Sequence, residues 1–218
     1  MSVIVDARRA ALLVVDMQLD FLPGGALGIA GGDQIVEPIR LLMTSGIFGL
    51  QVATQDWHPP GHVSFASTHG RRPYEVIDLD GLEQVLWPDH CVPGTFGADF
   101  HRDLDVRAVD LIIRKGNDPL IDSYSTFVEN DKKTLTGLHY YLQGMGIRSV
   151  YFCGLATDYC VCFSALDALA MGFQVTVLLD ACRGVDVPPG NIERAVGEMR
   201  NRGARILSGI SFADFVPQ

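Results

Sequence analysis

Short apolar runs alternate with longer amphipathic stretches along this 218-residue chain. Short runs that are apolar throughout are typical of strands buried on both faces of a parallel sheet. They occur at "ALLVVD" (11–16), "LQVATQD" (50–56), "DLIIRK" (110–115), "SVYFCG" (149–154), "QVTVLLD" (174–180) and, more weakly, "ARILS" (204–208). The stretches between them predict helices around 33–45, 131–145, 158–172 and 189–202. This alternation predicts an α/β fold with a doubly wound, mostly parallel β-sheet and helices on both faces.

The segment 57–103 interrupts the alternation. It is rich in Gly, Pro and His and contains "HPPGH", "WPDHC" and "PGTFGADFH". A connection of this length without regular structure is uncommon unless it carries function. No repeat, low-complexity tract or linker is found, so we expect a single domain over residues 1–218 with a functional loop in this segment.

Charge and composition narrow the classes of partner. The net charge is −9 and no dense Lys/Arg run is present, which argues against nucleic acid and anionic membrane as partners. The apolar runs are far too short to span a bilayer, and the first residues do not have the pattern of a signal peptide. Five cysteines without a regular framework favour a reduced, cytoplasmic setting.

Polar side chains stand at the ends of the predicted strands. Asp16, Asp56, Lys115 and Asp180 each close one strand, and His58 follows shortly after the second. Ligands of such sheets bind beyond the carboxyl ends of the strands, so these groups would converge with the cysteine stretch on one edge. The alternative is that polar residues simply mark strand ends. That explanation suits Asp180 well but does not explain why a lysine follows "LIIR".

Three of the cysteines lie within "VYFCGLATDYCVCF" at residues 150–163. Cys153 is inside a strand, where a small buried hydrophobe is the default interpretation. Cys162 shares a helical stripe with Leu166 and Leu169, which predicts a core face. Cys160 then faces elsewhere in the first helical turn, where backbone N–H groups favour a thiolate. A zinc knuckle needs a second cysteine pair, which is absent. Cys160 is therefore the candidate reactive thiol, with a merely buried cysteine as the alternative.

A thiol nucleophile needs a base or a nearby cation, and donors for an oxyanion. Asp16 can accept the thiol proton, and Lys115 can stabilise both a carboxylate and a thiolate. The backbone N–H groups of "LATDYC" lie where a strand turns into a helix, which favours an anion-binding nest. Asp16, Lys115 and Cys160 thus form the candidate catalytic set.

A second constellation has the residue types of a metal site. Asp56 and His58 stand on one short segment, and "WPDHC" adds His90. One carboxylate and two imidazoles are three protein ligands, and they leave positions for water or substrate, as in catalytic metal sites. His62 is a further candidate ligand. The alternative is that loop histidines are surface groups or support other residues.

Six stretches, taken in order, resemble the nicotinamidases of the isochorismatase-like cysteine hydrolase family. They are "LLVVDMQLDFLPGGAL", "ATQDWHPPGHVSFAS", "WPDHCVPGTFGADFH", "RKGNDPLIDSYSTF", "GLATDYCV" and "LLDACRGV". Together they cover nearly the whole chain, and no key position departs from the family pattern. The Asp, Lys and Cys motifs are those of the fold, while "DWH" with "WPDHC" separates nicotinamidases from most other members.

The resemblance implies roles for individual residues. Cys160 resembles the nucleophile, Asp16 the general base and acid, and Lys115 their electrostatic partner. The implied metal ligands are Asp56, His58 and His90 in the loop region around 56–103. The implied pocket residues around a pyridine ring are Phe21, Trp87 and Tyr124. The implied oxyanion donors are the backbone N–H groups of Ala156 and Cys160. The resemblance also implies a cis peptide bond between Leu155 and Ala156.

The implied reaction is the hydrolysis of nicotinamide to nicotinate and ammonia through a Cys160 thioester, in salvage toward NAD. The family implies one divalent metal ion, zinc or iron, with manganese as a further candidate, and no organic cofactor. A homo-oligomer is compatible with this assignment. Three alternatives remain open: an amidohydrolase of the same fold acting on a carbamoyl or ureido substrate, isochorismatase chemistry, and a non-enzymatic metal- or nucleotide-binding module.

Overall fold

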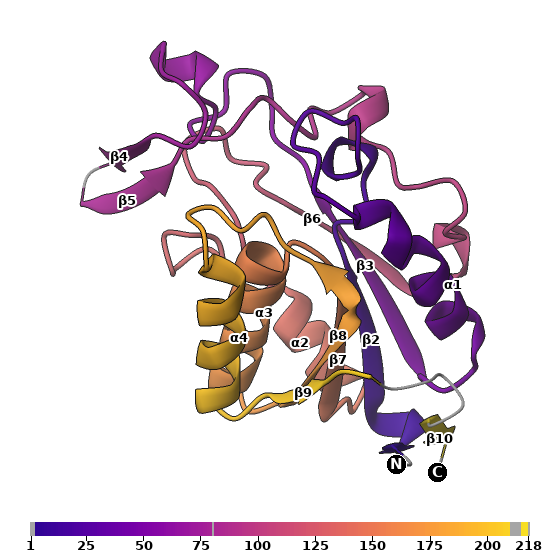
Figure 1. The fold of residues 1–218 in the computed structure, drawn as a ribbon. Coiled ribbons are helices and arrows are strands. Elements are labelled where there is room, and N and C mark those ends of the chain that lie inside the picture. Colours follow the sequence, from indigo (N-terminus) through magenta and orange to yellow (C-terminus); the bar gives the residue numbers. More distant parts are fainter. Residues whose placement is uncertain (1–2, 80, 210–214, 218) are drawn as a thin grey trace.

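The central element of the computed structural model is a six-stranded sheet in which every neighbouring pair is parallel (Figure 1). The structure describes residues 3–79, 81–209 and 215–217. The strand order is β6-β3-β2-β7-β8-β9. The strands are β2 (Ala10–Val15), β3 (Leu50–Asp56), β6 (Leu111–Lys115), β7 (Ser149–Leu155), β8 (Gln174–Arg183) and β9 (Arg205–Leu207). All six apolar runs are therefore confirmed as strands of one parallel sheet.

Helices cover both faces of this sheet, as predicted. Helix α1 (Val36–Thr44) packs on one face, and α3 (Cys162–Ala170) and α4 (Asn191–Asn201) pack on the other (Figure 1). A 3-10 turn at Gly32–Ile35 precedes α1, which accounts for the earlier start expected from the sequence. No helix in the described part of the chain is long and apolar enough to cross a membrane.

The prediction of a helix over 131–145 is wrong for its first half, because α2 covers only Leu138–Gly144. The carboxylate of Asp131 accepts the N–H groups of Lys133 and Thr134, which bends the chain into a turn. Short polar side chains that bond nearby backbone in this way compete with helix formation. The helix begins only after Gly137, whose φ of 90° no helical residue adopts.

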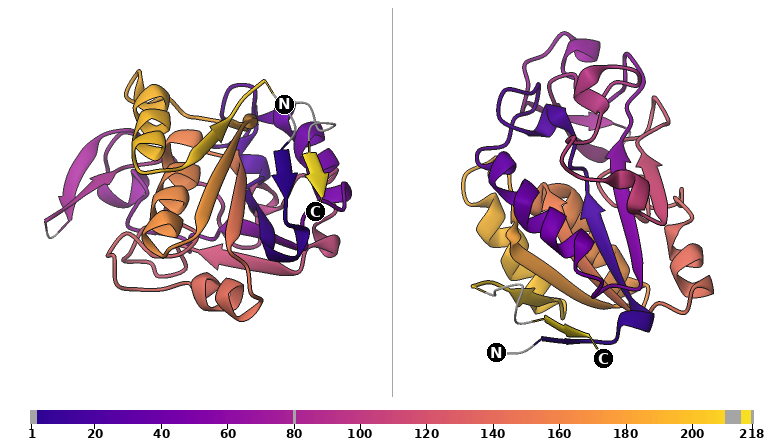
Figure 2. Two further views of the ribbon diagram at one scale, coloured as in Figure 1. Left: turned by 90° about the horizontal axis from the view of Figure 1, so that it is seen from below. Right: turned by 90° about the vertical axis from the view of Figure 1, so that its right-hand side faces the viewer.

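Two pairs of strands lie outside the predicted pattern. The hairpin of β4 (Val76–Leu79) and β5 (Leu82–Val85) projects from the segment 57–103 (Figure 1). Strands β1 (Val3–Val5) and β10 (Phe215–Pro217) pair in parallel and bring the two ends of the chain together (Figure 2). Each of these strands is only three or four residues long, too short for a periodic signal.

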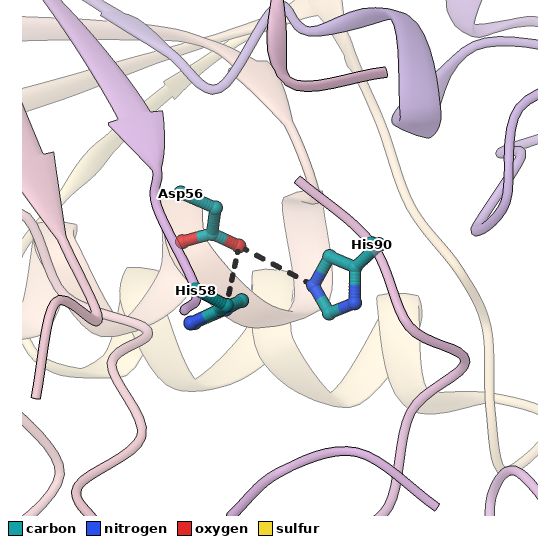
Figure 3. Close-up of side chains that lie close together, drawn as sticks. All are labelled: Asp56, His58 and His90. Carbon is teal, nitrogen blue, oxygen red and sulfur yellow. Dashed lines mark ion pairs between the residues drawn. The ribbon is translucent and has the colours of Figure 1, made fainter. Parts of the chain in front are cut away.

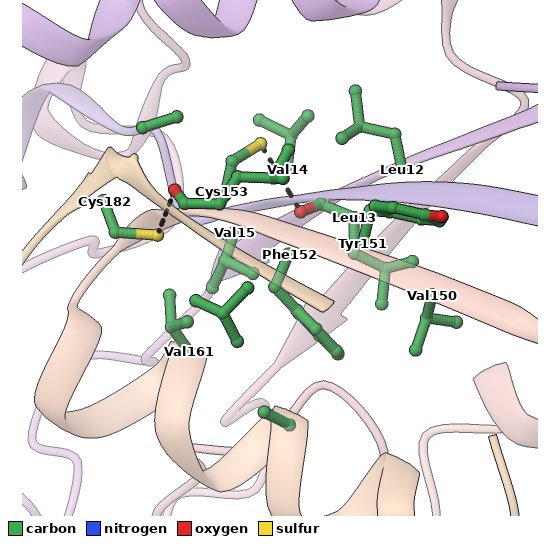
Figure 4. Close-up of a cluster of buried hydrophobic side chains, with 14 of the residues drawn as sticks. Leu12, Leu13, Val14, Val15, Val150, Tyr151, Phe152, Cys153, Val161 and Cys182 are labelled. Atoms are coloured by element: carbon green, nitrogen blue, oxygen red, sulfur yellow. Dashed lines mark hydrogen bonds between the residues drawn. The ribbon is translucent and has the colours of Figure 1, made fainter. Parts of the chain in front are cut away.

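The core fills the space between the sheet and its helices. All six residues of β2 are buried, and β7 is buried from Val150 onward. Figure 4 shows the contact of these strands with β8 and with Val161, which precedes α3. Cys153 lies inside this cluster with no exposed surface, as predicted, and Cys182 of β8 lies nearby (Figure 4). This buried apolar contact fixes how the ends of β2 and β7 lie relative to one another.

Four neighbouring strands present their carboxyl ends at one edge of the sheet. Lys115 is the last residue of β6 and Asp56 the last of β3, and the two are direct partners in the strand register. Asp16 follows β2, and Cys160 follows β7 by five residues. Because these strands are adjacent in the order β6-β3-β2-β7, the parallel register brings the four side chains to the same place.

Gly154 allows β7 to approach β2 at this edge. Its φ is +114°, and a Cβ at this position would lie 2.1 Å from the Val15 carbonyl oxygen. Backbone cannot move aside as a flexible side chain can, so only glycine fits here.

We therefore expect Gly154→Ala to destabilise the fold by more than about 4 kcal/mol, the range of severe backbone and packing defects. The matched control is Gly172→Ala, with a φ of +88° and no atom within 4 Å of the added Cβ. This control should lower the free energy of unfolding by only about 1–2 kcal/mol, the cost of a left-handed backbone conformation for a residue with a Cβ. Urea unfolding of the two variants tests this expectation, and equal losses would contradict it.

Candidate active site

The ammonium group of Lys115 is the centre of the site, and its side chain has 0% exposure. Its Nζ lies 2.9 Å from Asp16 Oδ2 and 3.3 Å from Cys160 Sγ, and it is also paired with Oδ1 of Asp56. It donates a further hydrogen bond to the Ser123 carbonyl oxygen at 3.2 Å. The lysine, the two acids and the thiol that follow the strand ends in the sequence thus converge.

The two carboxylates beside Lys115 have opposite pKa shifts. Burial raises the pKa of Asp16, and this effect exceeds the opposing charge of Lys115. Burial would also raise the pKa of Asp56, but Lys115 and His58 outweigh it and hold that pKa well below its ordinary value. Asp56 therefore keeps its negative charge, while Asp16 is the carboxylate that takes a proton more readily.

Cys160 lies in a π-helical turn, Thr157–Val161, between β7 and α3. The backbone N–H groups of this turn favour a thiolate, but burial raises the pKa of the thiol well above its ordinary value despite the opposing effect of Lys115. A thiol with a raised pKa becomes a nucleophile when a neighbouring base takes its proton. The Asp16 carboxylate lies within 4.8 Å of the sulfur.

Cys162 is separated from the site, as predicted. Its Sγ points toward the Ala195 carbonyl oxygen of α4 at 3.9 Å. The prediction that Cys162, Leu166 and Leu169 share one core-facing side of the helix is only partly correct. Leu166 and Leu169 are half-buried, whereas Ser164, Ala165 and Ala168 are fully buried residues of α3. The π-helical turn before α3 changes which positions face the core relative to a regular helix.

Asp56, His58 and His90 form a buried group in which one ligand atom from each lies within 4.8 Å of the others (Figure 3). Oδ2 of Asp56 lies 3.6 Å from His58 Nε2 and 3.7 Å from His90 Nε2. The other ring nitrogen of each histidine faces a carbonyl oxygen, that of Gly116 at 3.1 Å and that of Pro88 at 2.7 Å. A proton on Nδ1 satisfies each of these contacts and leaves the Nε2 atom of each ring available as a metal ligand.

His62 is adjacent to this group but belongs to a second cluster with His58 and Asp122. Its ring stacks against His58 with a centroid separation of 4.2 Å. Nδ1 faces Ser64 Oγ at 2.7 Å and Nε2 faces the Ile121 carbonyl oxygen at 3.2 Å. Burial lowers the pKa of His62 to about 4. A neutral His62 with both nitrogens engaged is better suited to support His58 than to bind a metal ion.

A cavity of about 350 Å³, part of it open to solvent, lies above these groups. Its lining includes every predicted metal ligand and pocket residue together with Cys160: Phe21, Asp56, His58, Trp87, His90, Tyr124, Ala156 and Cys160. Trp87 Nε1 donates a hydrogen bond to Tyr124 Oη at 3.2 Å. The peptide bond between Leu155 and Ala156 is cis, as the resemblance implied.

Several lining residues were not identified from the sequence. Tyr159 packs edge-on against Trp87 with centroids 4.8 Å apart, and its hydroxyl donates to the Val187 carbonyl oxygen at 2.7 Å. Leu27, Asp122, Ser123 and Val185 also line the cavity. The motif "ATDYC" contained a signal for Tyr159, because an aromatic residue beside a nucleophile in the first helical turn lies near the same cavity. Asp180 is not part of the site, since β8 continues for three residues beyond it.

Supporting residues fix the acids in place. Thr54 Oγ1 donates to Asp16 Oδ1 at 2.6 Å and accepts the Asp16 N–H at 3.2 Å. Gln18 forms a reciprocal pair with the Asp56 backbone, at 2.8 Å and 2.9 Å. Both acids are thus held by side chains of the strands or loops beside them. The sequence offered only one hint, the position of Gln18 two residues after Asp16.

Comparison with known proteins gives the family. The isochorismatase domain model matches residues 10–211. The chain is 48% identical to the nicotinamidase of Acinetobacter baylyi, over 93% of this chain and 94% of that protein. It is 44% identical to the nicotinamidase of Escherichia coli, over 91% of this chain and 94% of that protein.

Solved structures agree with these relatives. An Acinetobacter baumannii nicotinamidase and pyrazinamidase superposes with a TM-score of 0.89 at 48% identity, covering 92% of this chain and 96% of that one. An L. infantum protein in complex with nicotinate has a TM-score of 0.86 at 37% identity, with both chains fully covered. The pyrazinamidase of Pyrococcus horikoshii in complex with zinc has a TM-score of 0.74 at 41% identity, covering 92% and 99%.

The match of the domain model covers far more than half of the chain, and the two bacterial nicotinamidases exceed 40% identity over nearly their full length. The geometry of the acid, lysine, cysteine and histidine side chains agrees with an amide-hydrolysing site. The chain therefore belongs to the isochorismatase family and, within it, to the nicotinamidases, which are amidohydrolases.

Proposed function

We propose that this chain hydrolyses nicotinamide to nicotinate and ammonia through a thioester on Cys160, and so contributes to NAD salvage. The observation that carries the proposal is the buried contact of Lys115 with Asp16, Asp56 and Cys160 at the base of a cavity lined by aromatic side chains. The relatives named nicotinamidase and the nicotinate complex of the L. infantum protein support the choice of substrate.

The first half of the reaction forms the thioester. The Cys160 thiol gives its proton to Asp16, and the sulfur attacks the carboxamide carbon. The backbone N–H groups of Ala156 and Cys160 hold the resulting oxyanion. Asp16 then gives its proton to the amide nitrogen, the C–N bond breaks, and ammonia leaves.

The second half releases the acid. Asp16 accepts a proton from a water molecule, which attacks the thioester carbon. The C–S bond breaks, the sulfur regains its proton, and nicotinate is released. The raised pKa of Asp16 suits this repeated exchange of protons. Lys115 remains charged throughout, because the two carboxylates raise its pKa well above the ordinary value against the effect of burial.

Asp56, His58 and His90 fit a divalent ion, because their free ligand atoms converge and their Nδ1 atoms are engaged elsewhere. Such an ion, when bound, supplies a positive charge and a ligand position for the pyridine nitrogen of the substrate. One carboxylate and two imidazoles suit zinc, iron or manganese. The zinc complex of the Pyrococcus horikoshii pyrazinamidase supports zinc as the first candidate.

The cavity walls favour a flat aromatic amide. Phe21 lies next to His90 with ring centroids 5.4 Å apart. Trp87, Tyr124 and Tyr159 form edge-on contacts with one another on the cavity wall. Aromatic walls bind a planar ring by stacking and edge contacts, while a flexible ureido chain gains little from them.

The direct test of the proposed function is ammonia release from nicotinamide by the purified protein. We expect turnover of nicotinamide, and of its close aromatic analogue pyrazinamide, to exceed that of carbamoyl and ureido amides. A higher kcat/KM for a ureido substrate would overturn the assignment of substrate class.

The first mutational prediction concerns the nucleophile. Cys160→Ala should abolish turnover while the fold is retained, because no other thiol contacts Lys115 among the described residues. Cys162→Ala is the matched control and should keep activity, with a stability loss of at most a few kcal/mol. A pyridine carrying an electrophilic carbon in place of the carboxamide, followed by peptide mass spectrometry, locates the reactive sulfur. Labelling of Cys162 with Cys160 unmodified would refute the assignment.

The second mutational prediction concerns Asp16, the proposed base. Asp16→Asn keeps the shape of the side chain but cannot take a proton at the oxygen, so kcat should fall by about 10²–10⁴. Zinc affinity should fall far less than kcat, because Asp16 is outside the group of Asp56, His58 and His90 and contacts it through Lys115. Steady-state kinetics and a zinc titration check the two parts separately. A kcat close to wild type would remove Asp16 from proton transfer.

The third mutational prediction concerns the proposed metal ligand His90. His90→Ala, or removal of metal by chelation, should raise the KM for nicotinamide about 10–100-fold, since the ion is proposed to hold the ring. Cys160 should still react with a thiol reagent. His101→Ala is the control, because this half-buried histidine is outside all three groups of described residues that could hold a metal ion. Undiminished affinity for nicotinamide in metal-free protein would contradict the positioning role.

A further inference from the structure

The carboxylate of Asp20 joins segments of the chain that surround the metal-ligand group. Asp20 does not line the cavity and is not among the ligands. Its Oδ2 accepts the N–H of Cys91 at 2.7 Å, and its Oδ1 accepts the N–H of Ala26 at 3.3 Å. Cys91 directly follows the ligand His90, and Ala26 precedes the cavity residue Leu27.

Cys91 has an unusual backbone. Its φ is +50°, in the left-handed region that residues with a Cβ rarely adopt. In this conformation its N–H is bonded to Asp20, and its carbonyl oxygen accepts the N–H of His58 at 3.3 Å. One left-handed residue therefore connects the backbones of both histidine ligands.

The surroundings of Asp20 are shaped for a carboxylate. Two N–H groups are bonded to its two oxygens, and an ionised carboxylate accepts both, whereas an amide offers only one acceptor oxygen. Gly97 leaves the necessary room, because a Cβ there would lie 2.2 Å from the carboxyl carbon and both oxygens of Asp20. A charged acceptor also strengthens the bond to Cys91 relative to a neutral one.

We propose that Asp20 is a positioning residue for the metal site: it holds Cys91 in its left-handed conformation and thereby fixes the ligands His58 and His90. This inference rests on the proposed function, in which those histidines bind a divalent ion. It concerns the geometry of the ligand residues themselves, because the bonds from Asp20 to Cys91 and from Cys91 to His58 are formed by protein groups alone.

The test measures zinc affinity by competition with a chelating dye. Asp20→Asn should weaken zinc binding about 10–100-fold, the range for residues that orient metal ligands. Gly97→Ala should shift affinity in the same direction, because it displaces the carboxylate without removing its charge. Asp33→Asn is the matched control, since it removes one negative charge from an exposed residue of the neighbouring segment.

A second-site change at Cys91 tests the mechanism itself. Glycine adopts the left-handed conformation without a Cβ penalty, so Cys91→Gly in the Asp20→Asn background should regain about tenfold in zinc affinity. Cys91→Ala in the same background also removes the thiol but keeps the Cβ, and it should regain nothing. Rescue by glycine and not by alanine is specific to backbone conformation.

The outcomes distinguish a failure of the role of Asp20 from a failure of zinc binding itself. If Asp20→Asn binds zinc as wild type does and only lowers the urea stability of the metal-free protein, Asp20 has a merely structural role and the inference is overturned. Equal rescue by Cys91→Gly and Cys91→Ala would overturn it as well. If the wild-type protein itself binds no zinc, the metal part of the proposed function fails first, and this inference fails with it.

Discussion

The burial of one lysine between two carboxylates is the constraint on which the site depends. An isolated charge in the interior is costly, so Lys115 can remain there only while Asp16 and Asp56 stand beside it. Their positions follow from the parallel register of β6, β3 and β2, in which Asp56 and Lys115 are direct partners. A one-residue slip in any of these strands would turn a charged side chain to the opposite face. The apolar core therefore maintains the electrostatics of the site.

One lysine cannot neutralise two carboxylates, and the chemistry follows from that imbalance. Asp56 has further partners, because its second oxygen faces the two imidazoles, and it keeps its charge. Asp16 contacts the Thr54 hydroxyl and Lys115, and burial raises its pKa. Burial also raises the pKa of the thiol beside them. The arrangement thus provides a fixed charge for the metal half of the site and an exchangeable proton for the catalytic half, with Lys115 common to both.

Much of this organisation could be predicted from the sequence, because it depends on patterns that are local in the chain. The six apolar runs identified the sheet, and the polar residues after them identified its functional edge. Features without a periodic or motif signal in the sequence were not predictable in the same way. The turn at Asp131 that shortens α2, the hairpin of β4 and β5, and the effect of burial on the Cys160 thiol each depend on neighbours distant in sequence or on a few short-range hydrogen bonds. The sequence likewise could not show that the two ring nitrogens of His62 face Ser64 and the Ile121 carbonyl oxygen.

Two non-glycine residues with a left-handed backbone conformation lie at the site. Five described non-glycine residues have a positive φ, and two of them are Asp16 and Cys91. Such conformations are costly and persist only where surrounding contacts hold them. Asp16 is held by Thr54 and Lys115, and Cys91 by Asp20 and the backbone of His58. In both places a carboxylate and a left-handed residue occur together, at the base in one case and behind the metal ligands in the other. The ion-pair network and the backbone conformation of this site are therefore mutually dependent, which explains why motifs so far apart in the sequence occur together.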